Sequence, residues 1–185
     1  MSSSLFVSSI IIGVFSLAIS GYELQDIYES QLQKEFFASN VYLTFAHRLA
    51  TRGVYQGFAH FFYESAEEER EHGKKLLDFY NVRNRPLLFQ EIQINEDLAT
   101  MKDLAQMIKK AKDLEQEVYD NLIAVRQTAS EKRDYPTVHF IEKEMLEEQT
   151  TALKYMNDLV QRLERNTNNS TILLQMMDQD LRKKP

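Results

Sequence analysis

The segment 56–80 constrains the fold of this chain more than any other. Side chains that recur there at steps of three and four residues form the stripe that a bundle helix turns toward its neighbours. Glu69 and His72 lie one turn apart at the centre of this stripe, and burying such groups is costly unless they are paired or bound to a metal. The segment therefore predicts a long helix whose middle holds either a structural Glu–His ion pair or a pair of metal ligands. The full stripe is Phe58, Phe62, Ser65, Glu69, His72, Leu76 and Phe79.

Three other segments carry the same periodicity, and a polar residue interrupts the apolar stripe of each. The predicted helices are residues 22–49, residues 102–132 and a last long helix that starts near residue 136. On this last helix, Val138 and Glu142 are expected at the start of the inward stripe. The interrupting residues are Glu35, Glu115 and Gln149.

The connections between these helices predict their directions. Only a few residues near Gly53 join the first two helices, so the second helix returns antiparallel to the first. Residues 81–100 contain Pro86 and no convincing helix, and an extended loop of that length can run along a whole bundle. The third helix is then parallel to the second. The fold class is therefore all-α, a four-helix bundle with one long crossover and a short fifth C-terminal helix over residues 171–181.

The four interrupting residues are expected to meet. Each lies about twelve or thirteen residues after the start of its helix, which is near mid-height in a bundle of long helices. Antiparallel helices bring such residues to one level, so Glu35, Glu69, Glu115 and Gln149 converge on one polar site together with His72. Carboxylates and an imidazole suit hard cations and iron, and a metal explains all four interruptions at once.

The composition narrows the choice of partners. The 28 acidic residues outnumber the 22 basic ones, which gives a formal net charge of -6. This balance disfavours nucleic acid as a partner and suits the attraction of cations. The chain contains no cysteine, so a thiolate metal site and a disulfide framework are both excluded.

The N-terminal residues read as a targeting segment. Residues 5–19 are uncharged and apolar, but they are too few for a bilayer span, which needs roughly 20 residues. Small residues at Ala18 and Ser20 precede a possible cleavage point before Gly21. We expect residues 1–20 to be a signal peptide, residues 21–185 to form the domain, and the protein to be secreted, without a stable membrane anchor. The alternative is a cytoplasmic protein with an uncleaved extension. Asn168 and Asn169 head two glycosylation acceptor triplets.

Three stretches of this chain resemble the ferritin family: EFFASNVYL (35–43), ESAEEEREHGKKL (64–76) and FIEKEMLEEQ (140–149). The similarity extends from Tyr22 to Leu181. It implies a ferritin-like bundle of the catalytic, heavy-chain type that forms a 24-mer, either a homo-oligomer or a shell co-assembled with another ferritin subunit.

The resemblance also implies roles for individual residues. Glu35, Glu69 and His72 would hold one iron, with Glu69 bridging to a second iron beside Glu115 and Gln149. Tyr42 would be a hydrogen-bond partner of this site. Two neighbouring carboxylates are further metal-binding candidates, namely Glu68 and Glu148.

The expected function is iron storage and detoxification by ferroxidase activity. Fe(II) would be oxidised by O₂ at the di-iron site and deposited as ferric mineral inside the shell. Gln149 is followed at a spacing of three by Ala152 and not by His, so the second Glu-x-x-His of symmetric di-iron enzymes is missing. A neutral amide binds ferric iron weakly, which fits iron that passes through as a substrate. The alternatives are a non-catalytic secreted or yolk iron carrier and a di-iron oxygenase.

Two surface features follow from the same resemblance. Iron would enter through a channel at the start of the fourth helix, where Glu142 matches an acidic position and His139 departs from the family's second acidic residue. A strip of carboxylates on the outward face of the second helix would nucleate the mineral. The alternative for this strip is a solvated acidic face. Its members are Glu64, Glu67, Glu68 and Glu71.

Overall fold

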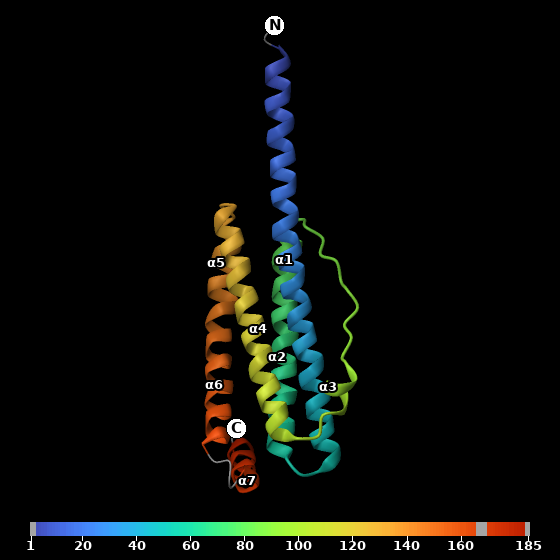
Figure 1. Ribbon diagram of the computed structural model, residues 1–185, viewed down its shortest axis with the longest axis vertical. Coiled ribbons are helices and arrows are strands. Elements are labelled where there is room, and N and C mark those ends of the chain that lie inside the picture. Colours follow the sequence, from blue (N-terminus) through green and yellow to red (C-terminus); the bar gives the residue numbers. More distant parts are fainter. Residues whose placement is uncertain (1–2, 166–169, 184–185) are drawn as a thin grey trace.

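The computed structural model describes residues 3–165 and 170–183, with side chains for residues 24–165 and 171–183, and this part of the chain is helical apart from its connections (Figure 1). No strand occurs in these ranges. The all-α prediction is confirmed. The elements are α1 (Ser3–Arg52), α2 (Gln56–Val82), α3 (Glu96–Thr100), α4 (Leu104–Glu131), α5 (Tyr135–Ile141), the π-helix η1 (Glu142–Leu146), α6 (Glu147–Glu164) and α7 (Ser170–Leu181).

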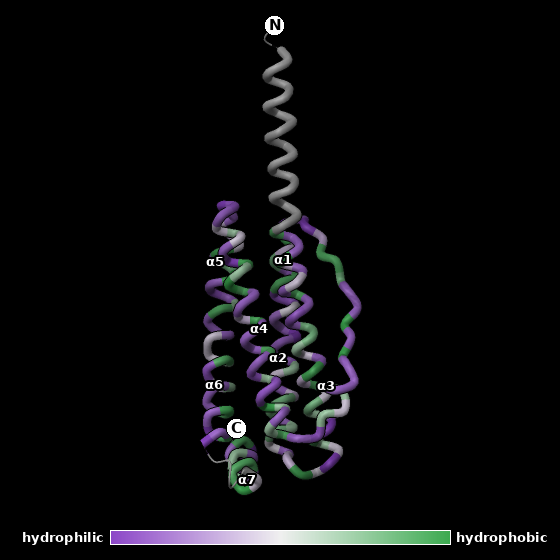
Figure 2. The backbone as a smooth tube through the Cα atoms, viewed as in Figure 1, coloured by the Kyte–Doolittle hydropathy of each residue, from purple (hydrophilic) through white to green (hydrophobic). Residues whose placement is uncertain are grey.

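Four long elements form the bundle: α1, α2, α4 and the continuous run α5–η1–α6. Figure 1 shows α2 and α4 running in the same direction, joined by the crossover that descends along the bundle, as the loop length predicts. Polar and apolar residues alternate along these helices (Figure 2), so each presents one apolar side to its neighbours. The expected four-helix bundle with one long crossover and a short C-terminal helix is therefore observed.

The apolar core consists of two halves. One half lies toward the α1–α2 turn and includes Phe45, Phe58 and Phe62. The other lies toward the opposite end and includes Tyr28 and Leu122. On every helix of the bundle, the predicted polar residue falls in sequence between side chains of the two halves. The four polar residues thus form one polar layer across the middle of the bundle, between the two apolar halves.

Side chains of α1 fasten the crossover to the bundle. Gln25 donates to the carbonyl oxygen of Pro86 at 3.4 Å, Glu29 accepts from the backbone N–H of Leu88 at 3.1 Å, and Gln33 donates to the carbonyl oxygen of Glu91 at 3.4 Å. These three α1 residues are four apart, so they form a ladder along one side of the helix. The ladder supplies hydrogen-bond partners that an extended segment cannot supply for itself.

The C-terminal helix α7 docks on the start of α2. The Asp178 carboxylate accepts a 2.9 Å hydrogen bond from the backbone N–H of Phe58, and Asp178 is also paired with Arg182. Gly57 allows this approach, because a Cβ atom there would lie 2.1 Å from the carbonyl oxygen of Asp178. A carboxylate at a helix N-terminus also interacts favourably with the helix dipole.

Three local predictions differ from the structure. Helix α1 starts at Ser3 and not at Tyr22, since no proline interrupts it. The crossover contains the short helix α3, which Asn95 caps by accepting from the N–H of Leu98. Glu142, which is predicted on the inward stripe, is exposed. The π turn of η1 leaves the preceding residue, Ile141, buried at that level instead.

The spacing of buried residues explains the π turn. Thr137, Ile141, Met145 and Gln149 are all buried and are four residues apart. An α-helix with 3.6 residues per turn would rotate such a series around its axis. The wider π turn takes up the extra rotation, and π-bulges occur frequently at functional sites. The register of Gln149 thus depends on η1.

The expectations of a signal peptide and of glycosylation stay predictions. Residues 1–2 of the expected signal peptide lie outside the described residues, and the backbone of residues 3–20 continues α1 beyond the end of the bundle (Figure 1). Asn168 and Asn169 also lie outside the described residues. Within the described part of the chain, we find no helix long and apolar enough to cross a membrane.

Candidate metal centre

The polar layer brings together the five side chains that the sequence singles out as a candidate metal site. They come from α1, α2, α4 and α6, and each has at most 8% of its surface exposed. These residues are Glu35, Glu69, His72, Glu115 and Gln149.

Three of these residues form an open ligand set. The Nδ1 atom of His72 lies 3.8 Å from Glu35 Oε2 and 3.6 Å from Glu69 Oε2, and one ligand atom of each residue lies within 4.8 Å of the others. These same three atoms are buried and have no hydrogen-bond partner. Unpartnered polar atoms are costly in a protein interior. A bound cation would satisfy all three at once.

The other half of the site is closed by hydrogen bonds. Glu115 Oε1 accepts from the Tyr42 hydroxyl at 2.6 Å, and Glu115 Oε2 accepts from the Gln149 side-chain amide. Gln149 also donates to the carbonyl oxygen of Glu115 at 3.1 Å. A cation that binds Glu115 therefore competes with the Gln149 amide for one carboxylate oxygen. The two halves of the candidate centre are not equivalent.

The electrostatics of this layer favour a cation. Burial, followed by repulsion from Glu115, raises the pKa of Glu69 to about 8. Burial also raises the pKa of Glu35, with Glu69 as the next cause, and burial raises the pKa of Glu115. Carboxylates this close cannot all ionise without a compensating positive charge. A divalent cation supplies that charge and releases the protons that the carboxylates otherwise hold.

His72 is oriented from outside the layer. Its Nε2 atom lies 2.9 Å from Glu148 Oε2, and Lys75 donates to the same oxygen at 3.0 Å. An Nε2–H that donates to Glu148 leaves Nδ1 as a free acceptor directed at Glu35 and Glu69, the usual arrangement for a metal-binding histidine. Burial alone would raise the pKa of Glu148, but the bonds from Lys75 and His72 outweigh it and the pKa is lowered. Glu148 thus contacts the outer nitrogen of His72 and is not a member of the open ligand set.

A groove of about 800 Å³ between α2 and α6 leads to the site, and Glu69, His72 and Glu115 are among its lining residues. Phe61, Tyr155 and Met156 line its apolar part. Five more carboxylates of α2 and α6 line its polar part: Glu64, Glu68, Glu71, Glu147 and Glu148.

The expected acidic strip on α2 is exposed, and it is divided by its contacts. Glu67 does not line the groove and lies 4.0 Å from Arg70. Glu64 contacts His60 at 3.2 Å, and Glu71 contacts Lys74 at 3.1 Å. Burial raises the pKa of Glu68 above its ordinary value. Glu64, Glu68 and Glu71 therefore face the site's groove, while Glu67 belongs to the outer surface.

The two residues expected at an iron channel lie apart from the site. His139 on α5 and Glu142 on η1 are both exposed. Glu142 is paired with Arg126 of α4 at 2.8 Å. Nothing in the helical periodicity relates residue 126 to residue 142, so this pair could not be predicted from the sequence. Arg126 reduces the negative charge that Glu142 offers to a cation.

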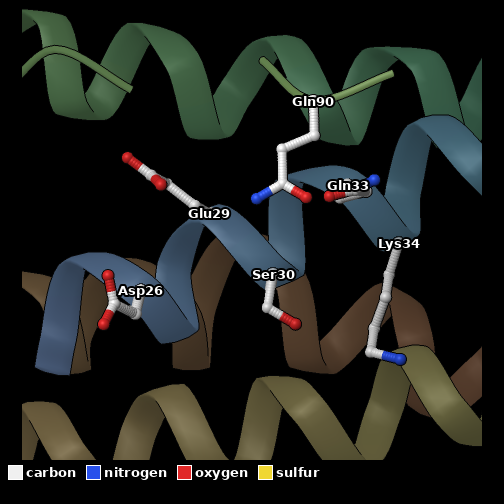
Figure 3. Close-up of a pocket in the computed structure, with 6 residues that line it drawn as sticks. All are labelled: Asp26, Glu29, Ser30, Gln33, Lys34 and Gln90. Carbon is white, nitrogen blue, oxygen red and sulfur yellow. The ribbon is translucent and has the colours of Figure 1, made fainter. Parts of the chain in front are cut away.

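Another hollow lies on the outer side of α1 and contains none of the site residues (Figure 3). Its lining includes Glu29, Gln33 and Gln90, and two of these hold the crossover. This hollow is therefore part of the fastening of the crossover and is separate from the candidate metal centre.

A bundle with a Glu-x-x-His pair and further carboxylates in its core defines a carboxylate-rich metal-binding four-helix bundle. Sequence comparison agrees with this class, since the model of the Ferritin-like domain family matches residues 26–166. The chain belongs to the ferritin family of iron-storage proteins.

Individual relatives span most of the chain. It is 35% identical to "Ferritin" of Pacifastacus leniusculus over 136 residues, which is 73% of this chain and 75% of that protein. It is 38% identical to "Ferritin, middle subunit" of Salmo salar over 133 residues, which is 71% of this chain and 75% of that protein. An iron-soaked crystal structure of a PmFTN variant matches with a TM-score of 0.76 and 26% identity, covering 84% of this chain and 97% of that chain.

Proposed function

We propose that this protein is a ferroxidase that oxidises Fe(II) with O₂ and stores the product as ferric mineral. The observation that carries this proposal is the set of three buried, unpartnered ligand atoms on Glu35, Glu69 and His72. In the proposal, the first Fe(II) binds these residues, and the second binds between Glu69, Glu115 and Gln149. Two Fe(II) give one electron each to O₂, which takes up two protons and leaves as hydrogen peroxide, and the Fe(III) product moves on. Iron is thus the substrate of the site.

Tyr42 and Glu148 support this site without being placed as ligands of the first iron. Tyr42 fixes one oxygen of Glu115, and burial raises the pKa of Tyr42, so its hydroxyl remains a donor at neutral pH. Glu148 fixes the ring of His72. Glu68, on the groove wall, would hold iron in transit.

Replacing Glu69 by Lys and His72 by Gly tests this assignment. The Lys side chain puts a positive charge where a cation must bind, so we expect rapid Fe(II) oxidation in air to be lost while assembly persists. Glu67→Gln is the control, because Glu67 is exposed and lies outside the groove. Oxidation by the double variant at the parent's initial rate would exclude this site as the ferroxidase centre.

The number of irons taken up separates ferroxidase storage from the alternatives. A storing ferroxidase takes up far more than two irons per chain, and a di-iron oxygenase stops near two. A non-catalytic carrier oxidises Fe(II) no faster than buffer. The missing second Glu-x-x-His and the closed hydrogen bonds of Glu115 and Gln149 favour iron that passes through the site.

We further propose that the chain assembles into a shell of 24 subunits, alone or together with another ferritin subunit. Apolar side chains that remain exposed on the single chain support burial in subunit contacts. Native mass spectrometry tests the size of the assembly. The most exposed members of this set are Val82, Leu88, Tyr135, Phe89 and Ile172.

We also propose that residues 1–20 are a secretory signal peptide. The uncharged apolar stretch and the small residues Ala18 and Ser20 support this proposal. Mass spectrometry of the native protein's N-terminus tests it, and the expected first residue is Gly21. A native chain that begins at or near Met1 would favour the cytoplasmic alternative.

A further inference from the structure

A chain of two amides, the buried Gln31 and the half-buried Asn121, leads to the Glu35 oxygen that is not in the open ligand set. Asn121 of α4 donates from Nδ2 to Gln31 Oε1 at 2.7 Å. Gln31 of α1 donates from Nε2 to Glu35 Oε1, also at 2.7 Å. Gln31 and Glu35 are fully buried, with no measurable exposed surface. The expected metal ligands do not include either amide.

We propose that Asn121 and Gln31 act as a positioning relay that holds one oxygen of Glu35 and presents only the other oxygen to a metal ion. This inference rests on the proposed function, because it assumes that Glu35 binds iron. It adds two positioning residues and a one-oxygen binding mode for Glu35.

The relay has a defined polarity. Asn121 Nδ2 lies 3.4 Å from the carbonyl oxygen of Ile27, an acceptor only, so this end of the Asn121 amide must be its NH₂ group. That NH₂ group faces Gln31, which must therefore present its oxygen to Asn121 and its own NH₂ group to Glu35. If Gln31 turned over, two NH₂ groups would face each other at its Asn121 end and two oxygens at its Glu35 end. The orientation of Gln31 is thus set from α4, across the bundle.

The polarity has a consequence for metal binding. Glu35 must be ionised to bind a metal, and the bond from Gln31 to Glu35 Oε1 is then charge-assisted and stronger than a bond between neutral groups. Glu35 Oε2 has no partner and lies in the open ligand set. Glu35 therefore offers a single oxygen. Hydrogen bonds of this kind orient metal ligands, and their loss typically weakens metal binding about 10–100-fold.

Asn121→Asp tests the relay with almost no change in side-chain volume. An Asp carboxylate at residue 121 accepts and cannot donate, so Gln31 turns its NH₂ group toward it and its oxygen toward Glu35. The resulting repulsion displaces Glu35. Asn121→Leu removes the hydrogen bond from residue 121 to Gln31. It gives the Gln31 amide no reason to turn over, so Gln31 keeps its favourable bond to Glu35. Gln31→Met removes the bond itself.

Co(II) is the probe, because its visible absorption reports both binding and coordination in the metal-free assembled protein. We expect Asn121→Asp and Gln31→Met to bind the first Co(II) about tenfold or more weakly than the parent, with altered band intensity. Asn121→Leu and the exposed charge control Gln127→Glu should bind it within about threefold of the parent, since neither reverses nor removes the bond to Glu35. A residue that matters only for packing would show the opposite order, with Asn121→Leu the more damaging substitution.

Two further results separate the relay from the function on which it rests. If His72→Ala binds the first Co(II) as tightly as the parent, the proposed metal site is wrong and the relay falls with it. If His72→Ala loses that Co(II) while Asn121→Asp and Gln31→Met both keep parental affinity and spectrum, the relay alone is overturned. Should Asn121→Asp fail to fold, Gln31→Met decides the outcome by the same criterion.

Discussion

Gln149 donates its side-chain amide to Glu115 across the bundle, and this contact closes one half of a polar layer whose other half, around His72, is open. The carboxylates of the layer come from three different helices. The asymmetry of the layer decides the order in which two cations would bind.

The two metal ions should bind with unequal affinity. The first ion finds one unpartnered ligand atom on each of Glu35, Glu69 and His72, whereas the second competes with the Gln149 amide for Glu115. A hydrogen bond to a charged group is worth about 1.5–3 kcal/mol, which corresponds to about a tenfold difference in affinity or more. Calorimetric titration of the metal-free protein with Zn(II) measures both steps. Two identical sites per chain would contradict this reading of Gln149.

Metal should stabilise the protein more at pH 8 than at pH 5.5. The pKa of Glu69 is raised from 4.5 to about 8, so the folded metal-free protein binds a proton that the unfolded chain releases. This contribution to the free energy of unfolding is complete below pH 4.5 and is lost as the pH rises toward 8. A bound cation takes the place of the proton and stabilises the ionised Glu69 carboxylate. The free energy of unfolding therefore does not fall as the pH rises. The Tm with and without Zn(II) at both pH values measures the effect, and Glu69→Gln should flatten it.

The crossover should depend on Glu29. Glu29→Ala removes the acceptor for the backbone N–H of Leu88. We expect a loss of about 1 kcal/mol in the free energy of unfolding and faster hydrogen exchange at Leu88. Glu29→Gln keeps an acceptor oxygen and is the matched control. Equal exchange rates in the Ala variant and the parent would show that the α1 ladder does not hold the crossover.

Iron uptake should respond to the charge around Glu142. Arg126→Ala frees the Glu142 carboxylate, and His139→Asp adds a carboxylate on the preceding turn, so each should speed early Fe(II) uptake by the assembled protein. Raised ionic strength should reduce the gain. Lys109→Ala on exposed α4 surface changes the net charge equally and is the control for Arg126→Ala. Unchanged stopped-flow rates in both variants would exclude this region as the route of iron.

Mineral growth should depend on the groove carboxylates and not on Glu67. Glu64→Gln with Glu71→Gln removes two charges from the groove while the metal centre stays intact. Early oxidation should persist, and mineral growth at high iron loading should slow. Glu67 lies outside the groove, so the Glu67→Gln variant should grow mineral at the parent's rate. If all three proteins grow mineral equally, the strip on α2 is only a solvated acidic face.

The periodicity of the sequence predicts the bundle and the residues of its polar layer, because a buried Glu or His interrupts an apolar stripe visibly. Ordinary helical spacing cannot reveal the π turn, and the prediction that Glu142 faces inward is therefore wrong. The α1 ladder and the pairing of Glu142 with Arg126 depend on how helices pack side by side. Gln31 could have been found from its spacing, four residues before Glu35. Asn121 carries no comparable signal.

The location of iron in the protein tests the central claim most directly. Crystals of the assembled protein soaked with Fe(II) without oxygen should give a strong anomalous diffraction peak between Glu35, Glu69 and His72, and a weaker one beside Glu115. Anomalous peaks confined to the exposed carboxylates of the groove, with none at His72, would contradict the proposed site.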